Sequence, residues 1–237
     1  MTLTLLTLLI LFIAALIKAT FGFGESVVAI PFLTLLWGLQ VAVPLLALLA
    51  TVITVLLLVR GWQRVAFKEL GPLFVGAALG VPVGVWGLKR LPSEWLITVL
   101  GLMLILMGLY NLFRPSVVTL RQSAWGYLFG FVAGALGGAY TIASPPIIIY
   151  GAARRWSPEV FRFTLQGLFL PLGGIIALSH GQAGLWTEPV LHLFALSLPV
   201  IGLAFWLGNI ISRRLTVQRF ERFVYAGIIL SGVMLLL

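Results

Sequence analysis

The chain has no cysteine and no aspartate, and charged residues make up only 9% of its 237 residues. Without cysteine there are no disulfides and no thiol chemistry, and cysteine usage does not indicate the redox compartment. Two histidines and no aspartate argue against a metal site with several ligands. The GxxxxGK[ST] pattern of a phosphate-binding loop is also absent. We therefore expect no metal, no cofactor and no hydrolysis of ATP by this chain.

Apolar residues are abundant instead: they make up 61% of the chain and give it a mean hydropathy of +1.16. Soluble domains are about 45–50% apolar and about 25% charged. Because a core of this size cannot hide the excess, we predict one all-α polytopic membrane domain over 1–237, in contact with the lipid bilayer. Basic cytoplasmic loops explain the net charge of +9, so nucleic acid is not an expected partner. The first apolar run has no basic residues before it, which argues against a cleaved signal peptide.

Eight apolar segments account for most of the chain. Two of them, Thr2–Trp37 and Trp125–Ala153, are interrupted in the middle by glycines and small polar residues. The other six are predicted to be ordinary membrane helices, which need about 20 residues each. They are Val41–Val59, Leu70–Leu88, Ser93–Phe113, Val160–Ser179, Glu188–Ile211 and Val217–Leu237, and His180 is placed in a loop.

The two interrupted segments resemble each other. When IKATFGFGESVVAIP from Ile17 is laid over VAGALGGAYTIASPP from Val132, Gly22 falls on Gly137 and Pro31 on Pro146. A second similarity follows in the same order, since KRLPSEW from Lys89 matches RRLTVQR from Arg213. Chance similarity between apolar segments is the alternative explanation. We predict two repeats, 1–115 and 122–237, each with a broken or re-entrant hairpin and three transmembrane helices.

Each interrupted segment could cross the membrane once or turn back as a hairpin. One helix over Thr2–Trp37 would be ~54 Å long, well beyond a hydrocarbon core of ~30 Å. Single crossings divide the basic residues nine to five between the two sides. Hairpins put Lys89 and Arg90 on one side, Lys18 within the membrane, and all the others on the opposite side. Those others are Arg60, Arg64, Lys68, Arg114, Arg121, Arg154, Arg155, Arg162, Arg213, Arg214, Arg219 and Arg222.

The hairpin arrangement agrees better with the positive-inside rule. It gives each repeat three crossings, so the repeats are inverted relative to each other and the two hairpin tips meet near the midplane. Irregular backbone at that depth is tolerated only where protein or a water-filled cavity satisfies it. The two interruptions are therefore the candidate functional site.

The chemistry of the tips suits an anion. Each turn is followed by a new helix, predicted to begin at Glu25–Val28 and at Tyr140–Ala143, and its N-terminus is electropositive. Lys18 adds a positive charge, or else it pairs with Glu25 or extends to an interface. Glu25, an intramembrane carboxylate, is the candidate for proton coupling.

Glycines and hydroxyls complete the predicted site. We assign Gly22, Gly24, Gly137 and Gly138 to the turns, and Gly130 and Gly134 to helix packing. Hydroxyls at the tips either contact the substrate or bond to a carbonyl of their own helix. Pro31, Pro145 and Pro146 are expected to shape the helices that follow the turns. The predicted substrate-binding residues are Lys18, Thr20, Gly22, Phe23, Gly24, Ser26, Gly137, Gly138, Tyr140, Thr141 and Ser144.

The chain resembles the TauE/SafE sulfite exporter family in two kinds of motif. These are the glycine-rich turns followed by proline, GFGESVVAIP and GGAYTIASPP, and the basic pairs of KRLPSEW and RRLTVQR. The resemblance covers essentially the whole chain, and the turn glycines, Pro31 and Pro146 fall on the family pattern. Lys18, Glu25 and Tyr140 come from chemistry rather than from that pattern. The second copy departs from it with Ala139 and a Pro145–Pro146 pair, so the two tips need not contribute equally.

That resemblance implies a secondary transporter of a small anion, such as sulfite or an organosulfonate, in the cytoplasmic membrane. A non-transporting subunit of a membrane complex is the alternative. An intramembrane enzyme is less favoured because no nucleophile with a matching base is visible. The substrate, the direction of flux and the oligomeric state, a homo-oligomer included, stay open.

The hairpin topology places the loops Gly61–Glu69 and Arg114–Ser123 together on the cytoplasmic side. Single cysteines introduced there should both be shielded from an impermeant thiol reagent in intact cells, and both should react after lysis. The natural chain gives no background because it has no cysteine. Opposite accessibility of the two loops would instead support single crossings.

Overall fold

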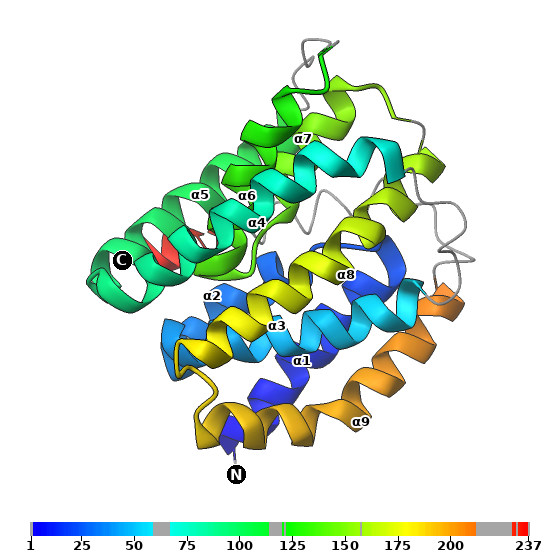
Figure 1. Cartoon of the computed structure of the whole chain (residues 1–237). Helices are drawn as coiled ribbons and strands as arrows, with labels where there is room; N and C mark the ends of the chain where they lie inside the picture. The colour runs from blue at the N-terminus through cyan, green and yellow to red at the C-terminus, as the bar shows by residue number, and fades with distance from the viewer. Residues whose placement is uncertain are drawn as a thin grey trace.

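A computed structural model of the chain describes residues 2–58, 67–113, 120, 122–156, 158–211, 229–230 and 232–236. Within these ranges the regular elements are helices, as predicted (Figure 1). The predicted span Val217–Leu237 lies largely outside them, although 229–230 and 232–236 are helical. The helices are α1 (Thr2–Phe21), α2 (Glu25–Trp37), α3 (Leu39–Leu58), α4 (Phe67–Arg90), α5 (Ser93–Phe113), α6 (Trp125–Tyr140), α7 (Ser144–Ala153), α8 (Pro158–Gln182) and α9 (Glu188–Ile211).

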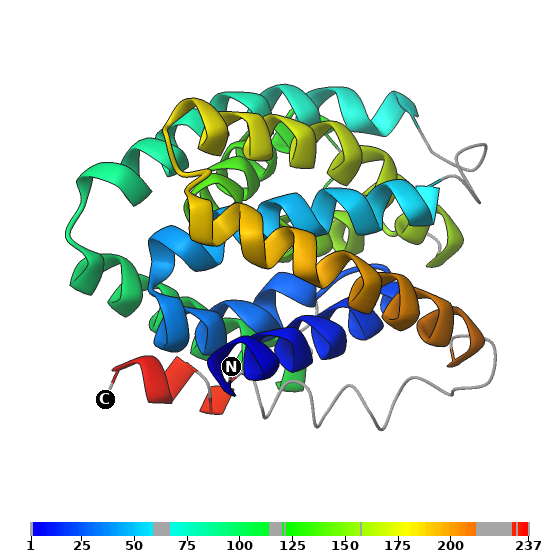
Figure 2. The same ribbon diagram turned by 90° about the horizontal axis from the view of Figure 1, so that it is seen from below.

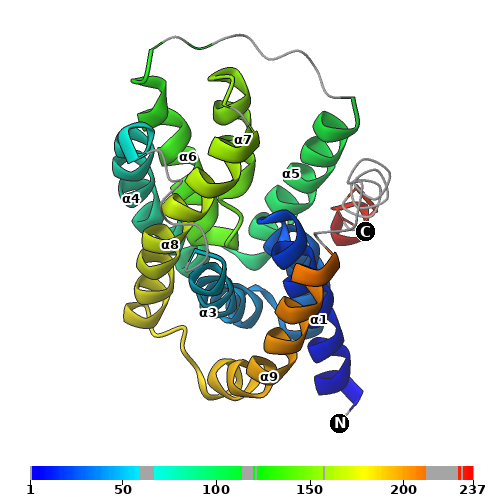
Figure 3. The same ribbon diagram turned by 90° about the vertical axis from the view of Figure 1, so that its right-hand side faces the viewer.

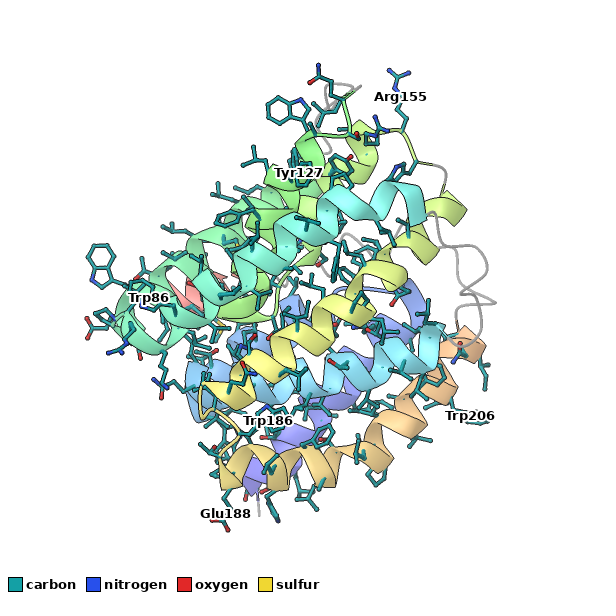
Figure 4. All side chains as sticks on the ribbon, in the orientation of Figure 1. Trp86, Tyr127, Arg155, Trp186, Glu188 and Trp206 are labelled. Atoms are coloured by element: carbon teal, nitrogen blue, oxygen red, sulfur yellow. The ribbon has the colours of Figure 1, made fainter. Side chains whose placement is uncertain are left out.

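The helix lengths and surfaces suit a bilayer. Among the described residues, α1, α3, α4, α5 and α9 are long and apolar enough to cross a membrane. Large apolar side chains remain exposed on their outer faces, including Leu79, Leu106 and Leu203, where lipid is the natural neighbour. Exposed Trp86, Trp186 and Trp206 lie toward the ends of the bundle (Figure 4), as expected of an aromatic belt. The chain is thus a multi-pass membrane protein.

The first interrupted segment is a helical hairpin. Near its open end, the Trp37 indole Nε1 donates to Thr7 Oγ1 at 2.8 Å. Near its closed end, Lys18 and Glu25 form an ion pair. Contacts at both ends require α1 and α2 to run antiparallel. The turn between them contains Gly22 and Gly24 with φ of 90° and 97°, a left-handed conformation that favours glycine.

The second interrupted segment is also a hairpin. The Tyr150 ring on α7 lies 5.7 Å from the Phe129 ring near the start of α6. The closed end is at Thr141, whose φ of 59° ends α6, and α7 begins at Ser144. The second helix therefore starts later than the Tyr140–Ala143 start predicted from the sequence.

The two hairpins enter from opposite ends of the bundle. One residue, Gly38, separates the open end of the first hairpin from α3, while α8 follows the open end of the second. Helices α3 and α8 pack together and run in opposite directions (Figure 1). Lys18 reaches the Ala50 carbonyl on α3, and Thr141 reaches the Val43 carbonyl on the same helix. The tips thus pass each other beside the middle of α3, which lies inside the bundle in Figure 2.

Described basic residues occur at both ends of this arrangement. Arg154 and Arg155 follow α7 at the open end of the second hairpin, where Arg154 donates to the Leu120 carbonyl. Helix α4 runs parallel to α6, so Lys89 and Arg90 lie beyond the closed end of that hairpin. Single crossings would put all four residues on one side, whereas the hairpin arrangement separates them.

Helices from the two halves of the chain pack closely. Helix α4 lies along α6, and α1 lies along α9 (Figure 3). In the first pair, glycines recur every four residues on both facing surfaces. An added Cβ would lie only 2.0–2.4 Å from a backbone oxygen of the facing helix. These glycines are Gly76, Gly80 and Gly84 on α4, and Gly130, Gly134 and Gly138 on α6.

This packing confirms the role predicted for Gly130 and Gly134 and corrects the role predicted for two other glycines. Gly137 and Gly138 lie inside α6 and do not form the turn. Gly138 packs against the Val81 carbonyl, and a Cβ on Gly137 would meet Ile176 Cδ1 at 2.8 Å. Close contact with a facing backbone requires glycine at position 138, whereas a Cβ at position 137 would displace only the end of the Ile176 side chain.

Gly134→Ala should destabilise the α4–α6 contact, because the added Cβ would lie 2.0 Å from the Ala77 oxygen. We expect a loss of about 1–3 kcal/mol, typical of overpacking, measured as a lower thermal unfolding midpoint of the purified protein. The control is Gly174→Ala on α8, where an added Cβ would meet nothing within 4 Å. Equal midpoints for the two variants would contradict the packing role.

Candidate functional site

Both hairpin tips line one small cavity. Its volume is about 40 Å³, which is room for roughly three water molecules. The cavity lies where the first helix break, the second helix break, α3 and α8 converge. Its lining consists of Lys18, Phe23, Gly24, Glu25, Ser26, Val27, Ala50, Thr54, Thr141, Ala143, Ser144, Phe169, Leu172, Gly173 and Ile176.

Lys18 is the cationic group of the cavity. It lies in the last turn of α1 and is only 2% exposed. Its Nζ lies 2.5 Å from Glu25 Oε1 and donates to the Ala50 carbonyl at 3.2 Å. The Phe169 ring centroid is 6.0 Å away, at the outer limit for a cation–π contact. Of the alternatives left open by the sequence, Lys18 takes the one in which it pairs with Glu25 rather than extending to an interface.

The start of α2 adds hydrogen-bond donors. Gly24 caps this helix, so the N–H groups of Glu25, Ser26 and Val27 have no carbonyl within the helix to bond. All three residues line the cavity. The Ser26 hydroxyl is buried and has no hydrogen-bond partner among the described residues. The first tip therefore combines a cation, a helix N-terminus and a free hydroxyl.

The second tip contributes two hydroxyl residues to the lining. The Thr141 hydroxyl donates to the Val43 carbonyl at 3.1 Å, which attaches the tip to α3. Ser144, 6% exposed, is the first residue of α7. This tip carries no charged residue in the cavity, so the two tips contribute unequally.

Five residues predicted to bind the substrate are not in the lining of this cavity. The Tyr140 hydroxyl donates to the Leu96 carbonyl at 3.0 Å, and this residue is not in the cavity lining. The Thr20 hydroxyl donates to the Leu16 carbonyl one turn back in α1, which is the alternative weighed for such hydroxyls. Gly137, Gly138 and Gly22 are also absent from the lining.

The three prolines lie in the helices that follow the breaks. Pro31 is inside α2, where a proline removes one intrahelical hydrogen bond. Pro145 and Pro146 belong to the first turn of α7, where that missing N–H costs little. All three positions agree with the predicted placement after the turns.

Helix α8 contacts the backbone near both helix breaks through two buried polar side chains, Gln166 and His180. The Gln166 amide donates to the Gly22 carbonyl in the first turn. His180 Nε2 donates to the Gly138 carbonyl near the second at 2.8 Å. His180 is fully buried within α8, so its predicted loop position is wrong. A polar residue within an apolar span was the available signal for Gln166, and nothing in the sequence pointed to Phe169.

Among the described residues, no group of three or more histidine, cysteine, aspartate or glutamate side chains could hold a metal ion. The chemistry of the cavity is that of one lysine, one glutamate and several hydroxyl and N–H groups.

Comparison with known proteins gives two similarities. The sequence model of the family described as "Sulfite exporter TauE/SafE" matches residues 7–235. A protein of Comamonas testosteroni named "Probable inner membrane transporter protein TsaS" is 22% identical over 176 residues, covering 73% of this chain and 74% of that protein. No solved structure matches the chain significantly.

Gln166→Leu should weaken the first tip by leaving the buried Gly22 carbonyl without its donor. An unsatisfied buried polar group costs about 1–3 kcal/mol, so the thermal unfolding midpoint should fall by several degrees. Gln182→Leu is the matched control, because Gln182 is exposed at the end of the same helix. If the control lowers the midpoint as much as Gln166→Leu does, the hydrogen bond to Gly22 is not important.

Proposed function

Because the chain belongs to the TauE/SafE sulfite exporter family, we propose that it is a secondary transporter of a small anion, with sulfite or an organosulfonate as the candidate substrate. The anion binds in the cavity between the two hairpin tips. The observation that carries the proposal is the position of Lys18, a buried cation in a cavity lined by both helix breaks.

The surroundings of Lys18 suit an oxyanion. Lys18, the residues at the start of α2 and Ser26 all line the same cavity, and the ammonium, N–H and hydroxyl groups that they carry are hydrogen-bond donors. From the second half of the chain, Ser144 adds its hydroxyl and its backbone N–H, whereas Pro145 and Pro146, which follow it in α7, have no N–H to donate. An anion there would contact both halves at once, which a substrate must do to couple their movement.

Alternating access follows from the opposed hairpins. The packing of α1 against α9 and the packing of α6 against α4 are equivalent contacts, because α1 and α6 are the first helices of the predicted repeats 1–115 and 122–237, and α4 and α9 hold the same place in each. We propose that these halves are inverted copies, and that rocking of one half against the other exposes the cavity to each side in turn. The similar protein is named a probable inner membrane transporter, and we propose the cytoplasmic membrane as the location of this chain as well.

Lys18→Ala should lower anion affinity and uptake at least ~10-fold, because truncating one partner of a buried charge pair removes a large interaction. The measurement is uptake of labelled sulfite by liposomes containing the purified protein. Lys89→Ala is the control, since Lys89 is exposed at the end of α4. Thermal unfolding of both variants tests whether each is folded.

Two outcomes would contradict the proposal. Absence of flux through the wild-type protein for a whole panel of small anions would favour the non-transporting subunit. Unchanged uptake in a folded Lys18→Ala protein would remove Lys18 from the substrate site and leave transport itself intact.

A further inference from the structure

The ammonium group of Lys18, which an anion would bind, already has an anionic partner. Lys18 Nζ has three N–H donors, and two have partners in the Glu25 carboxylate and the Ala50 carbonyl. Glu25 Oε1, at 2.5 Å, holds the position that an oxygen of a bound oxyanion would take. The substrate and Glu25 therefore compete for one cation.

The charges around the cavity offer the anion no second cation to bind. Of the described residues that line it, only Lys18 and Glu25 are charged. Helix α3 contributes Ala50 and Thr54, α7 contributes Ser144, and α8 contributes Phe169, Leu172, Gly173 and Ile176, none of which is an acid or a base. With both groups ionised the cavity is neutral overall, and an entering anion meets no net positive charge.

We propose that the Glu25 carboxylate competes with the transported anion for Lys18. The anion displaces Glu25 from Lys18, and Glu25 takes up a proton as this happens. The transported anion carries a single charge. This inference rests on the proposed function. A neutral Glu25 carboxyl no longer needs a cation as its partner, so Lys18 becomes free for the anion. Each anion is then accompanied by one proton.

The single positive charge of Lys18 also limits the charge of the substrate. Lys18 and a monoanion form a neutral pair, as Lys18 and Glu25 did before. A dianion would leave one negative charge without a cationic partner in a cavity whose other described lining residues, apart from Glu25, are uncharged, and an unpaired charge is costly in such surroundings. The single charge of Lys18 thus selects a singly charged anion.

The position of Glu25 supports this exchange. Glu25 is the first residue of α2, where a negative charge is favoured by the free N–H groups of the helix. A bound anion beside Ser26 and Val27 would supply that negative charge after Glu25 becomes neutral. The Ser26 hydroxyl, 4% exposed and without a partner among the described residues, is available to it.

The test uses methanesulfonate, whose charge does not change with pH in the working range, and the purified full-length protein. Calorimetry gives the affinity, and a pH indicator in weakly buffered solution counts the protons taken up on binding. We expect the wild type to take up close to one proton per bound methanesulfonate when Glu25 starts ionised. We expect sulfate, a dianion, to bind at least ~10-fold more weakly.

Glu25→Gln removes the competitor while keeping a side chain of the same shape. We expect methanesulfonate to bind this variant ~10-fold more tightly than the wild type at alkaline pH, with no proton uptake. Glu188→Gln, an exposed glutamate at the start of α9, should behave as wild type. If the unpaired Lys18 prevents the Glu25→Gln protein from folding, the number of protons that the wild type takes up on binding still tests the inference.

Three results would overturn the inference: wild-type binding without proton uptake, a folded Glu25→Gln protein that binds no more tightly, or sulfate binding equal to that of methanesulfonate. All three leave anion binding itself intact and so do not touch the proposed function. Absence of binding for every anion, in the wild type and in both variants, would instead count against the proposed function and the inference together.

Discussion

A buried ion pair between Lys18 and Glu25 joins the end of α1 to the start of α2 across the first helix break. Charges at this depth are stable only when paired and hydrogen-bonded, so the surroundings must supply partners and exclude lipid. The Ala50 carbonyl of α3 accepts a further hydrogen bond from Lys18, and the second hairpin covers the other side of the cavity. The first break therefore requires the second hairpin and the α3–α8 centre of the bundle.

The exposed backbone of each break imposes a related requirement. Carbonyl and N–H groups released from a helix inside a bilayer need partners from the protein or from trapped water. Gln166 and His180 on α8 bond to carbonyls beside the two breaks, and the Thr141 hydroxyl bonds to α3. Tight glycine contacts between α4 and α6 hold the second hairpin in place. The N–H groups at the start of α2 have no carbonyl partner within the helix, and this is one reason why we propose that an anion binds there.

Much of this arrangement could be predicted from the sequence, because the physical signals were local. Apolar runs gave the helices, and Gly22 and Gly24 gave the first turn. The second turn was misplaced because glycine serves a turn and a close helix contact equally well, and only the facing helix shows which applies. Gly138 faces the Val81 carbonyl, a contact that no local pattern contains. The same limitation explains Tyr140, which bonds to Leu96, and His180, which is buried against α6.

The central claim is that one anion binds between the two tips and contacts Lys18. Crystals of the protein grown with hydrogen selenite, a selenium analogue of hydrogen sulfite, would locate the anion directly by anomalous diffraction. The account predicts a selenium peak in the cavity, within hydrogen-bond reach of Lys18 Nζ and the Ser26 hydroxyl, with Glu25 withdrawn from Lys18. A well-occupied peak elsewhere in the bundle, with the ion pair still closed, would contradict it.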